Sequence, residues 1–389
     1  MPRALPPVTL RRFGAVTAAG LGLDSFWRAV AAAEPLARPV ARYDVTGLAV
    51  RRAALVPADV WRDVEARRPG VPRAAALALA AVDDALGGEA PDPDTALFLG
   101  TSLGGVDAWE PWHAALVRGE AMRDAPACAG HDDVAPLVAR ALGLRGPAVT
   151  VSTACTSSAA ALMMAADAVR LGECERALVV GVDVLGRFVH AGFDRLGALT
   201  PDALAPRPFC ADRAGMWLGE AAAAVLVTRD GPAVARYLGG GAAGDGVHMT
   251  APDREGGGLA RAVERSLAEA GLGPDAVCWV SAHATSTRFN DAMEAAGLAR
   301  VFGSRVPPTH GAKPVVGHTL GASGLLEAAL CAEALVRGVR PPTHAPGATD
   351  PALAHVPVDR AAAPMGAGVA LSLNSAMAGH NTAVVLGAP

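Results

Sequence analysis

Apolar runs rich in β-branched residues alternate with alanine-rich stretches along most of the chain. Six of these runs predict buried strands, at 96–102, 148–152, 177–184, 222–228, 278–283 and 368–374. The stretches between them, such as 159–173 and 324–338, predict helices. Strands and helices alternate in this way in α/β proteins, whose largely buried strands are covered by helices. The fold class is therefore expected to be α/β.

One unit, an apolar strand followed by a tight turn and an alanine-rich helix, is predicted twice, over 148–173 and 313–338. The final segments of the two predicted helices, DAVRLG and EALVRG, start at Asp167 and Glu333, which are 333 − 167 = 166 residues apart. This spacing indicates two halves of like topology, which we place at 1–235 and 236–389. The glycine-rich stretch 238–246 has neither G-x-G-x-x-G nor G-K-[ST], so we expect it to be a plain connection.

Composition excludes several classes of function. The 389 residues are 51% hydrophobic and 19% charged, with a net charge of −4, so no large basic face is available for nucleic acid or an anionic membrane. No apolar run reaches the length of a spanning helix; that from Ala74 to Val82, for example, ends at Asp83. The first 20 residues have no apolar block of the kind found in secretion signals, so we expect a cytoplasmic protein.

Six cysteines occur without any C-x-x-C pair, which argues against a disulfide framework and a zinc site. Cys155 differs from the others because it follows a predicted strand and opens a predicted helix. Helix N–H groups and the positive end of the helix dipole favour a thiolate there, so Cys155 is the candidate nucleophile. Cys174, Cys278 and Cys331 have the apolar or helical surroundings of ordinary buried cysteines.

A thiolate, or a carbanion that forms beside it, needs a proton acceptor or an N–H donor near neutral pH. Among the ten histidines, His283 ends the strand predicted at 278–283, and His318 lies at the turn of the second repeated unit. Sites in α/β proteins usually form at the carboxyl ends of strands. These two histidines are therefore the candidate partners of Cys155.

Lys313 is the only lysine in the chain and lies five residues before His318, on the approach of a predicted strand. Lysine offers a compact ammonium in place of a rigid guanidinium fork, so an arginine-rich chain that uses lysine here indicates a special role. Glu220 leads a carboxylate into the apolar strand at 222–228, which is costly without a cationic partner. We expect Lys313 to be that partner.

Several segments together resemble the β-ketoacyl-acyl-carrier-protein synthases of the elongating type. They are TACTSS around Cys155, RPFCADRAGMWLGEA from Arg207, HATSTRFND from His283 and KPVVGHTLGASG from Lys313, with similar segments near both ends of the chain. The resemblance implies a thiolase-like fold, with two α/β halves stacked as five layers (αβαβα), usually as a dimer. It also implies that Cys155, His283 and His318 form a Cys-His-His triad.

The resemblance further implies a decarboxylative condensation, in which Cys155 takes an acyl group and a malonyl thioester then supplies an enolate. Backbone amides of Cys155 and of the loop at Met377 and Ala378 would hold the oxyanion. Thr285 and Thr287 would bind the pantetheine arm of the substrate.

The same resemblance implies that Lys313 and Glu220 would hold the histidine network. No metal or redox cofactor is implied, because phosphopantetheine arrives on the acyl carrier protein. The implied partners are that carrier protein, acyl and malonyl thioesters, and a second copy of the chain or a related ketosynthase-like subunit.

Three positions depart from the family pattern. Ala284 stands where the family has a small glycine, and Cys210 stands where it usually has aspartate. The family's loop N-S-F-G-F-G-G is shorter here, reads N-S-A-M-A-G from Asn374, and has no phenylalanine. Because that loop usually gates the site, the change bears on substrate scope and rate.

Trp109 follows the strand and glycine pair of ALFLGTSLGG. In similar synthases this segment lies at the dimer interface and closes the far end of the partner's acyl pocket. A large rigid ring there is expected to favour short or planar acyl groups.

Three alternative functions share the implied fold. A thiolase would need a second catalytic cysteine near the C-terminus, but no cysteine follows Cys331. A tunnel-shaping partner subunit would lack the nucleophile, which is present here. An acyltransferase that passes the acyl group to an amine or hydroxyl stays open, given Ala284 and the altered loop.

Overall fold

The computed structural model describes residues 5–120, 126 and 128–389. The first four residues of the expected first half, and residues 121–125 and 127, lie outside the described residues. Its main feature is an 11-stranded sheet with the order β11-β10-β14-β15-β9-β1-β8-β7-β5-β6, and β2 pairs with β1 at its side. Strands β1 and β9 join the two halves of this sheet by antiparallel pairing of Val8–Leu10 with Ala235–Tyr237.

The two halves of the sheet have the same topology. The first contains β1 (Val8–Thr17), β5 (Ala96–Gly100), β6 (Ala148–Val151), β7 (Arg176–Asp183) and β8 (Ala221–Thr228). The second contains β9 (Ala235–Gly244), β10 (Val277–Ser281), β11 (Thr309–His310), β14 (Val369–Ser375) and β15 (His380–Gly387). If the five strands of each half are numbered 1 to 5 in chain order, their order across the sheet is 1-5-4-2-3 in both halves. Strands 4, 2 and 3 pair in parallel, and the other neighbours pair antiparallel. The repeat inferred from sequence is therefore a repeat of the fold.

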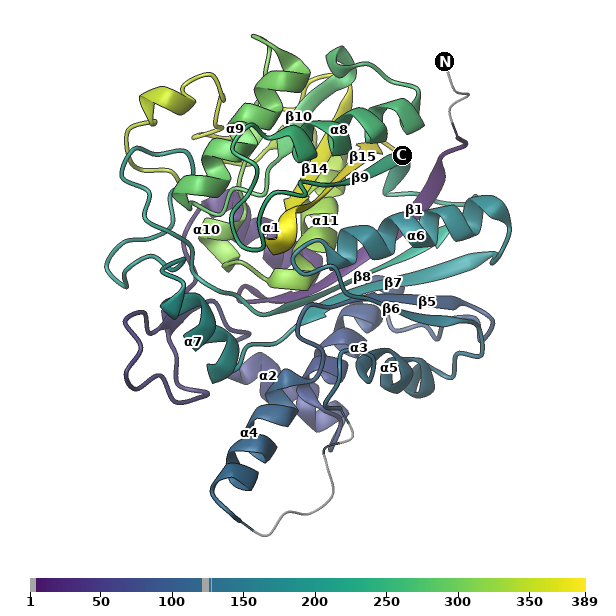
Figure 1. Ribbon diagram of the computed structural model, residues 1–389. Coiled ribbons are helices and arrows are strands. Elements are labelled where there is room, and N and C mark those ends of the chain that lie inside the picture. Colours follow the sequence, from purple (N-terminus) through teal and green to yellow (C-terminus); the bar gives the residue numbers. More distant parts are fainter. Residues whose placement is uncertain (1–4, 121–125, 127) are drawn as a thin grey trace.

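Helices cover both faces of each half-sheet (Figure 1). On one outer side lie α3 (Arg73–Leu86) and α5 (Val134–Leu142), and on the other lie α8 (Gly257–Ala270) and α9 (Arg288–Phe302). Between the half-sheets pack α6 (Ser157–Leu171) and α11 (Ser323–Arg337). This gives the five-layered thiolase-like arrangement that the sequence resemblance implies.

The remaining elements are short or lie at the edges. The helices are α1 (Leu23–Ala32), α2 (Ala58–Arg67), α4 (Val106–Val117), α7 (Arg187–Arg195) and α10 (Lys313–Val316), with short 3-10 turns at Pro274–Ala276, Leu320–Ala322, Pro351–Leu353 and Met377–Gly379. The short strands are β2 (Gly20–Leu21), β3 (Arg38–Pro39), β4 (Arg52–Ala53), β12 (Val339–Arg340) and β13 (Ala363–Pro364).

The inner helices approach each other closely because small residues line their contact. A Cβ atom at Gly324 would lie 2.7 Å from the Cβ atom of Ala159, so a larger residue would push α11 away from α6. The segments before these two helices, which carry Cys155 and His318, are thereby brought together at the centre of the molecule.

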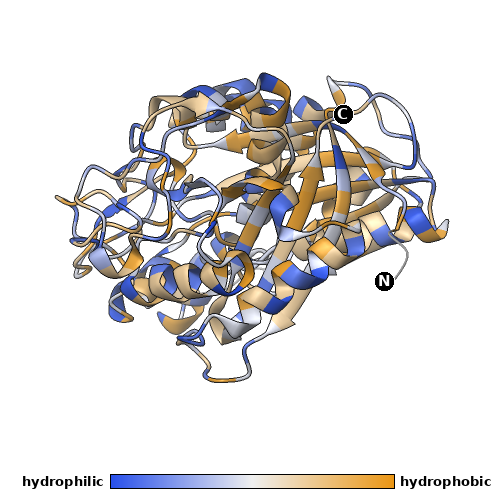
Figure 2. Ribbon diagram, turned by 90° about the horizontal axis from the view of Figure 1, so that it is seen from above, coloured by the Kyte–Doolittle hydropathy of each residue, from blue (hydrophilic) through white to orange (hydrophobic). Residues whose placement is uncertain are grey.

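Apolar residues concentrate in the strands and on the inner helices (Figure 2). The outer helix α3 is also buried along almost its whole length, whereas the outer helix α8 keeps exposed polar residues on one side. Burial of this apolar surface is the main source of stability for such a layered fold. Among the described residues, no helix has both the length and the apolar character needed to cross a bilayer.

Two expectations about local structure are wrong. The stretch that begins at Lys313 is the short helix α10 and not a strand; Pro314 suits the first turn of a helix, and Gly317, with φ of 72°, ends it. The glycine-rich stretch 238–246 is not a plain connection, since most of it belongs to β9 at the middle of the sheet. Glycine is needed there because a Cβ at Gly241 would lie 2.1 Å from the carbonyl oxygen of Ala262 in α8.

Candidate active site

Cys155 lies in a sharp turn between β6 and α6. The preceding residue, Ala154, has a φ of 53°, and hydroxyl groups hold the turn in this shape. The Ser157 hydroxyl donates to the carbonyl of Ala154 at 2.5 Å and accepts from the Thr153 N–H at 2.9 Å. Cys155 is itself buried, with 7% of its surface exposed, and borders a cavity.

His318 lies beside the thiol of Cys155. Its Nε2 atom is 3.0 Å from Cys155 Sγ, and its Nδ1 atom is 3.2 Å from the hydroxyl of Ser323. Both residues precede the inner helix of their own half, so the repeated topology brings them together. The expected proximity of Cys155 and His318 is present in the structure.

His283 follows the end of β10 and completes the group. Its ring lies perpendicular to that of His318, at 88°, with the ring centres 5.2 Å apart. The carboxylate of Glu294 on α9 accepts hydrogen bonds from the backbone N–H groups of His283, at 2.6 Å, and of Ala284, at 2.8 Å. This carboxylate fixes the loop that carries His283 against the body of the second half.

Burial controls the protonation of the three groups. It lowers the pKa of His283 and His318 well below the usual value, and the Lys313 ammonium lowers both further. Burial also raises the pKa of the Cys155 thiol to about 12, which Lys313 only partly opposes. The resting group is therefore a neutral thiol with two neutral imidazoles, and burial outweighs the helix N-terminus that favoured a thiolate in the sequence analysis.

Lys313 does not pair with Glu220, so that expectation is wrong. Its ammonium lies 2.5 Å from Glu327 Oε1, and the other oxygen of Glu327 accepts from the Asn374 side chain at 2.5 Å. All three side chains are buried. The sequence signal that was missed is a single acidic residue in the otherwise apolar first turns of α11, 14 positions after Lys313.

Glu220 belongs to a separate cluster at the start of β8. Its carboxylate contacts Arg42 at 3.1 Å and Arg73 at 2.5 Å, and accepts from the Val56 N–H at 3.1 Å. All three partners lie before residue 80, in a part of the sequence where no motif pointed to them. Glu220 therefore holds the N-terminal segment onto the sheet and does not border the cavity.

A cavity of about 530 Å³ opens next to the triad. Its walls include four of the predicted substrate-binding residues, namely Thr285, Thr287, Met377 and Ala378, together with Cys155, His283 and His318. The hydroxyls of Thr285 and Thr287 are 3.0 Å from each other. Lys313, Glu220 and Trp109 are not among its lining residues.

The loop that faces Cys155 across this cavity is a tight turn over Ala376–Gly379. Three of its N–H groups donate to backbone carbonyls: that of Ala376 to His380, that of Ala378 to Met249, and that of Gly379 to Ala376. The N–H of Met377 has no such acceptor within the described residues. It is therefore the amide of this loop that is free to bind a substrate oxygen.

Trp109 lies on α4, which projects from the body of the molecule (Figure 1). Its ring stacks on that of His113, with centres 4.6 Å apart, and meets Phe188 edge-on at 6.3 Å. Phe188 is 65% exposed. Trp109 is not among the residues that line the cavity of its own chain, and its expected place in a partner's pocket stays a prediction.

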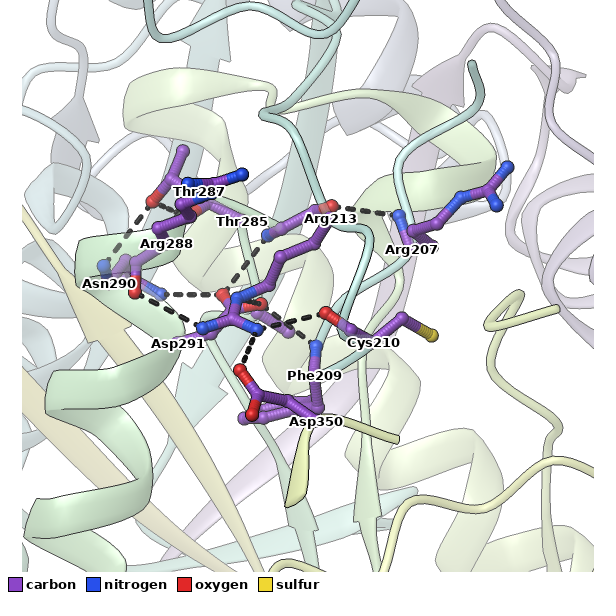
Figure 3. A network of polar contacts seen from close by, with 12 residues as sticks. Arg207, Phe209, Cys210, Arg213, Thr285, Thr287, Arg288, Asn290, Asp291 and Asp350 are labelled. Atoms are coloured by element: carbon purple, nitrogen blue, oxygen red, sulfur yellow. Dashed lines mark hydrogen bonds and ion pairs between the residues drawn. The ribbon is translucent and has the colours of Figure 1, made fainter. Parts of the chain in front are cut away.

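A buried arginine supports the loop after His283, as Figure 3 shows. Arg213 lies between Asp350, at 2.7 Å, and Asp291 of α9, at 3.6 Å. Asp291 in turn accepts from the N–H groups of Ser286 and Phe209.

Burial raises the pKa of Asp291 to about 6 and that of Glu294 to about 7. These carboxylates were not singled out from sequence, although the spacing of Asp291 and Glu294 on one helix face was visible.

Known proteins share both this fold and its sequence signature. The family model described as "Beta-ketoacyl synthase, N-terminal domain" matches residues 8–233, and "Beta-ketoacyl synthase, C-terminal domain" matches residues 234–345. The chain belongs to the beta-ketoacyl synthase family.

Relatives within the family align with most of the chain. A putative polyketide beta-ketoacyl synthase 1 of Streptomyces cyaneus is 30% identical, over 98% of both chains. The 3-oxoacyl-[acyl-carrier-protein] synthase 2 of Vibrio harveyi is 29% identical over 86% of this chain and 87% of its own. A solved structure titled "The ishigamide ketosynthase/chain length factor" has a TM-score of 0.89 and 30% identity, covering 99% of this chain and 100% of that one.

The positions that depart from the beta-ketoacyl synthase pattern have visible consequences. Ala284 has a φ of 44°, a conformation that glycine adopts at no steric cost and alanine does not. The thiol of Cys210 lies 3.5 Å from the Gly347 carbonyl and 3.8 Å from Arg360 Nη2. An aspartate at position 210 would place a carboxylate beside that arginine.

Proposed function

We propose that the protein is an elongating β-ketoacyl-acyl-carrier-protein synthase, an acyltransferase that forms carbon–carbon bonds by decarboxylative condensation. The contact of Cys155 Sγ with His318 Nε2, at 3.0 Å beside an open cavity, is the observation that carries the proposal. A nucleophile within hydrogen-bond distance of a base is the arrangement that covalent acyl transfer needs. A ketosynthase-like subunit that only shapes a tunnel has no use for it.

In the first step Cys155 Sγ attacks the carbonyl carbon of an acyl thioester, and His318 Nε2 takes the thiol proton. The carbonyl oxygen becomes an oxyanion, held by the backbone N–H groups of Cys155 and Met377. When the tetrahedral intermediate collapses, the pantetheine sulfur leaves and receives the proton from His318. The product is an acyl-Cys155 thioester and a free carrier thiol.

In the second step a malonyl thioester enters the same cavity. Its carboxylate leaves as carbon dioxide, and the electron pair moves into an enolate whose oxygen is stabilised by N–H donors of His283 and His318. The enolate carbon attacks the acyl-Cys155 carbonyl, and the Cys155 sulfur leaves as a thiolate that takes a proton from solvent water. The product is a β-ketoacyl thioester on the carrier protein. Neutral imidazoles suit this role, and burial keeps both histidines neutral.

The hydroxyl of Ser323 allows His318 to act in both steps. It lies 3.2 Å from His318 Nδ1 and 3.1 Å from the hydroxyl of Thr319. A hydroxyl can donate to or accept from Nδ1. His318 can therefore expose a bare Nε2 to the thiol in the first step and an Nε2–H to the enolate in the second.

The substrate side of the proposal rests on the cavity walls. Thr285 and Thr287 would hydrogen-bond the pantetheine arm, which arrives with the acyl carrier protein and is not a resident cofactor. Arg288, which also lines the cavity, supplies positive charge for an acidic carrier protein. The second subunit would be another copy of this chain or a ketosynthase-like partner, as in the ketosynthase/chain length factor named above.

Intact-mass spectrometry after incubation with a panel of acyl thioesters tests the first step. We expect one acyl adduct per chain, absent from Cys155→Ala. Addition of malonyl-carrier protein should then release a product two carbons longer than the bound acyl group. Transfer of the unextended acyl group to an amine or hydroxyl would instead identify an acyltransferase without condensation, and absence of any adduct would favour a tunnel-shaping subunit.

The two histidines are tested by separating the half-reactions. His283→Ala should form the acyl adduct at a rate close to that of the parent protein but should not release carbon dioxide from malonyl thioester. His318→Ala should be impaired in both, because only His318 contacts the thiol. Normal carbon dioxide release by both variants would overturn the assignment.

A further inference from the structure

One side-chain hydrogen bond joins the two segments that carry the oxyanion amides. Nδ1 of His380, the residue after the Ala376–Gly379 turn, lies 2.8 Å from the hydroxyl of Thr156, the residue after Cys155. Within the described residues, it is the one side-chain hydrogen bond that we find between 376–380 and 153–157. The two residues are 224 positions apart in the chain, so the bond links the first half of the molecule to the second.

The Thr156 hydroxyl is committed to this link and not to capping its helix. Thr156 is the residue before α6, where a threonine side chain ordinarily accepts from the first helical N–H groups, but it makes no such bond. Its hydroxyl instead lies 2.6 Å from the Thr153 carbonyl and 2.9 Å from the Thr153 hydroxyl. Since Thr156 O–H donates to the carbonyl, its lone pair is left to accept from His380 Nδ1–H.

The other anchors of the loop bind it to the chain that follows β9. The Gly379 carbonyl accepts from the Asp245 N–H at 2.7 Å, and Asp245 accepts from the Asn381 side chain at 2.8 Å. These bonds fix the loop within its own half. Neither bond involves a residue of the segment 153–157 that carries Cys155.

We propose that His380 is a positioning residue, which holds the Met377 amide at the correct distance from the Cys155 amide through its hydrogen bond to Thr156. This rests on the proposed function, because the two amides matter only where an oxyanion forms. The loop in this chain has neither of the family's phenylalanines, so few side chains other than His380 are available to hold it. An oxyanion hole depends on donors fixed before the reaction, so a loop that moves by a fraction of an ångström loses rate without losing its fold.

A double-mutant cycle with His380→Ala and Thr156→Val tests the proposal, with acylation of Cys155 by an acyl thioester as one readout. Each single variant should slow acylation by about tenfold or more, since outright loss of one oxyanion donor costs roughly 10²- to 10³-fold. The double variant should be no slower than the slower single variant. Thr156→Ser, which keeps the hydroxyl, and His380→Asn, whose Nδ2 can replace Nδ1 as donor, should recover most of the rate.

Alkylation of Cys155 by iodoacetamide is the matched control, because it needs the thiol and its access but no oxyanion hole. The alkylation rate should be unchanged in His380→Ala. His355→Ala changes a histidine that does not line the cavity, so it should alter neither the acylation rate nor the alkylation rate. Equal loss of acylation and alkylation would mean general damage to the site and would overturn the proposal.

Amide hydrogen exchange of the segment 374–381 gives a readout that does not depend on turnover. His380→Ala and Thr156→Val should each speed exchange in this segment by a similar factor, with no further gain in the double variant. Exchange equal to that of the parent protein would overturn the link. If the parent protein forms no acyl adduct with any thioester, the proposed function fails, and the exchange measurement still decides whether His380 holds the loop.

Discussion

The sulfur of Cys155 and the Nε2 atom of His318 lie 3.0 Å apart, although the two residues are separated by 163 positions in the chain. Each occupies the turn before the inner helix of its half, so the duplicated topology places a thiol from one copy against an imidazole from the other. Neither half contains both groups. The chemistry is therefore expected to require correct packing of α6 against α11.

Cys155→Ala should abolish formation of the acyl-enzyme, because no other cysteine contacts a histidine in this way within the part of the chain that the structure describes. Cys174→Ala is the control; Cys174 lies after α6 and its pKa is raised by partial burial, so its removal should leave the adduct intact. Intact-mass spectrometry of both variants measures the result. An adduct on Cys155→Ala protein would remove Cys155 from the mechanism.

The reactivity of Cys155 should rise with pH well above neutrality. Burial raises the pKa of its thiol to about 12, so the thiolate fraction is small at pH 7 and grows about tenfold with each pH unit below that value. The pKa of His318 lies well below its usual value, so His318 stays neutral over this range. Iodoacetamide alkylation between pH 6 and 9, corrected with Cys155→Ala, should show no plateau. A plateau that begins near pH 7 would instead indicate a thiolate–imidazolium pair.

The buried pair of Lys313 and Glu327 should matter for stability as well as for the histidines. Lys313→Met leaves the Glu327 carboxylate buried without its cation, which costs about 3–5 kcal/mol of unfolding free energy. The double variant Lys313→Met/Glu327→Leu removes the unpaired charge and should recover most of this loss. Urea unfolding of the single and the double variant measures the difference in their free energies of unfolding. Equal values for the two variants would show that Lys313 and Glu327 are not energetically coupled.

Lys313→Arg should fold but lose most condensation activity. The cavity beside Lys313 and Glu327 is only about 10 Å³, too small for the larger guanidinium fork without displacement of its neighbours. Turnover with acyl and malonyl thioesters measures the loss. Full activity in this variant would mean that the single lysine is an accident of composition.

The three residues of the expected triad were visible in the sequence because each lies in a recognisable local pattern. The structure places them together, and their shared catalytic role stays a prediction. Cys155 and His283 follow apolar strands, and the duplicated helix pattern around 159–173 and 324–338 foreshadows the duplicated fold. Such signals are local, and a sheet brings strand ends together by its topology. The strand limits at 148–151 and 277–281 differ by only one or two residues from the predicted ones.

The charge partners could not be assigned because pairing depends on side-chain direction and distance. Lys313 and Glu220 both looked isolated in apolar surroundings, yet Glu327 and the arginines at 42 and 73 are their partners. The glycine-rich strand β9 was missed for a related reason. Its glycines lack strand propensity and are required by the close approach of α8, which no local pattern reveals.

Ala284→Gly should stabilise the protein. Ala284 has a φ of 44°, in the left-handed region that costs a residue with a Cβ atom about 1 kcal/mol relative to glycine. The added chain entropy of glycine in the unfolded state opposes part of this gain. Urea unfolding should show a rise in stability of a few tenths to ~1 kcal/mol, whereas Ala282→Gly in the preceding segment, where φ is not positive, should destabilise. A loss of stability in both variants would mean that the backbone at Ala284 carries no strain.

Trp109 gives the prediction about acyl length. Its ring stacks on His113, and neither belongs to the cavity wall of its own chain, so any effect on the acyl pocket must act across a subunit interface. A linear acyl chain longer than the partner's pocket would have to displace this ring, at a cost of about 1–3 kcal/mol. Trp109→Ala should therefore relax a preference for short or planar acyl groups toward longer ones, and Trp112→Ala on the same helix is the matched control. Acylation rates across a series of chain lengths measure the preference. The same length profile in Trp109→Ala and in the parent protein would place Trp109 outside the pocket, and a change common to both tryptophan variants would reflect loss of the interface instead.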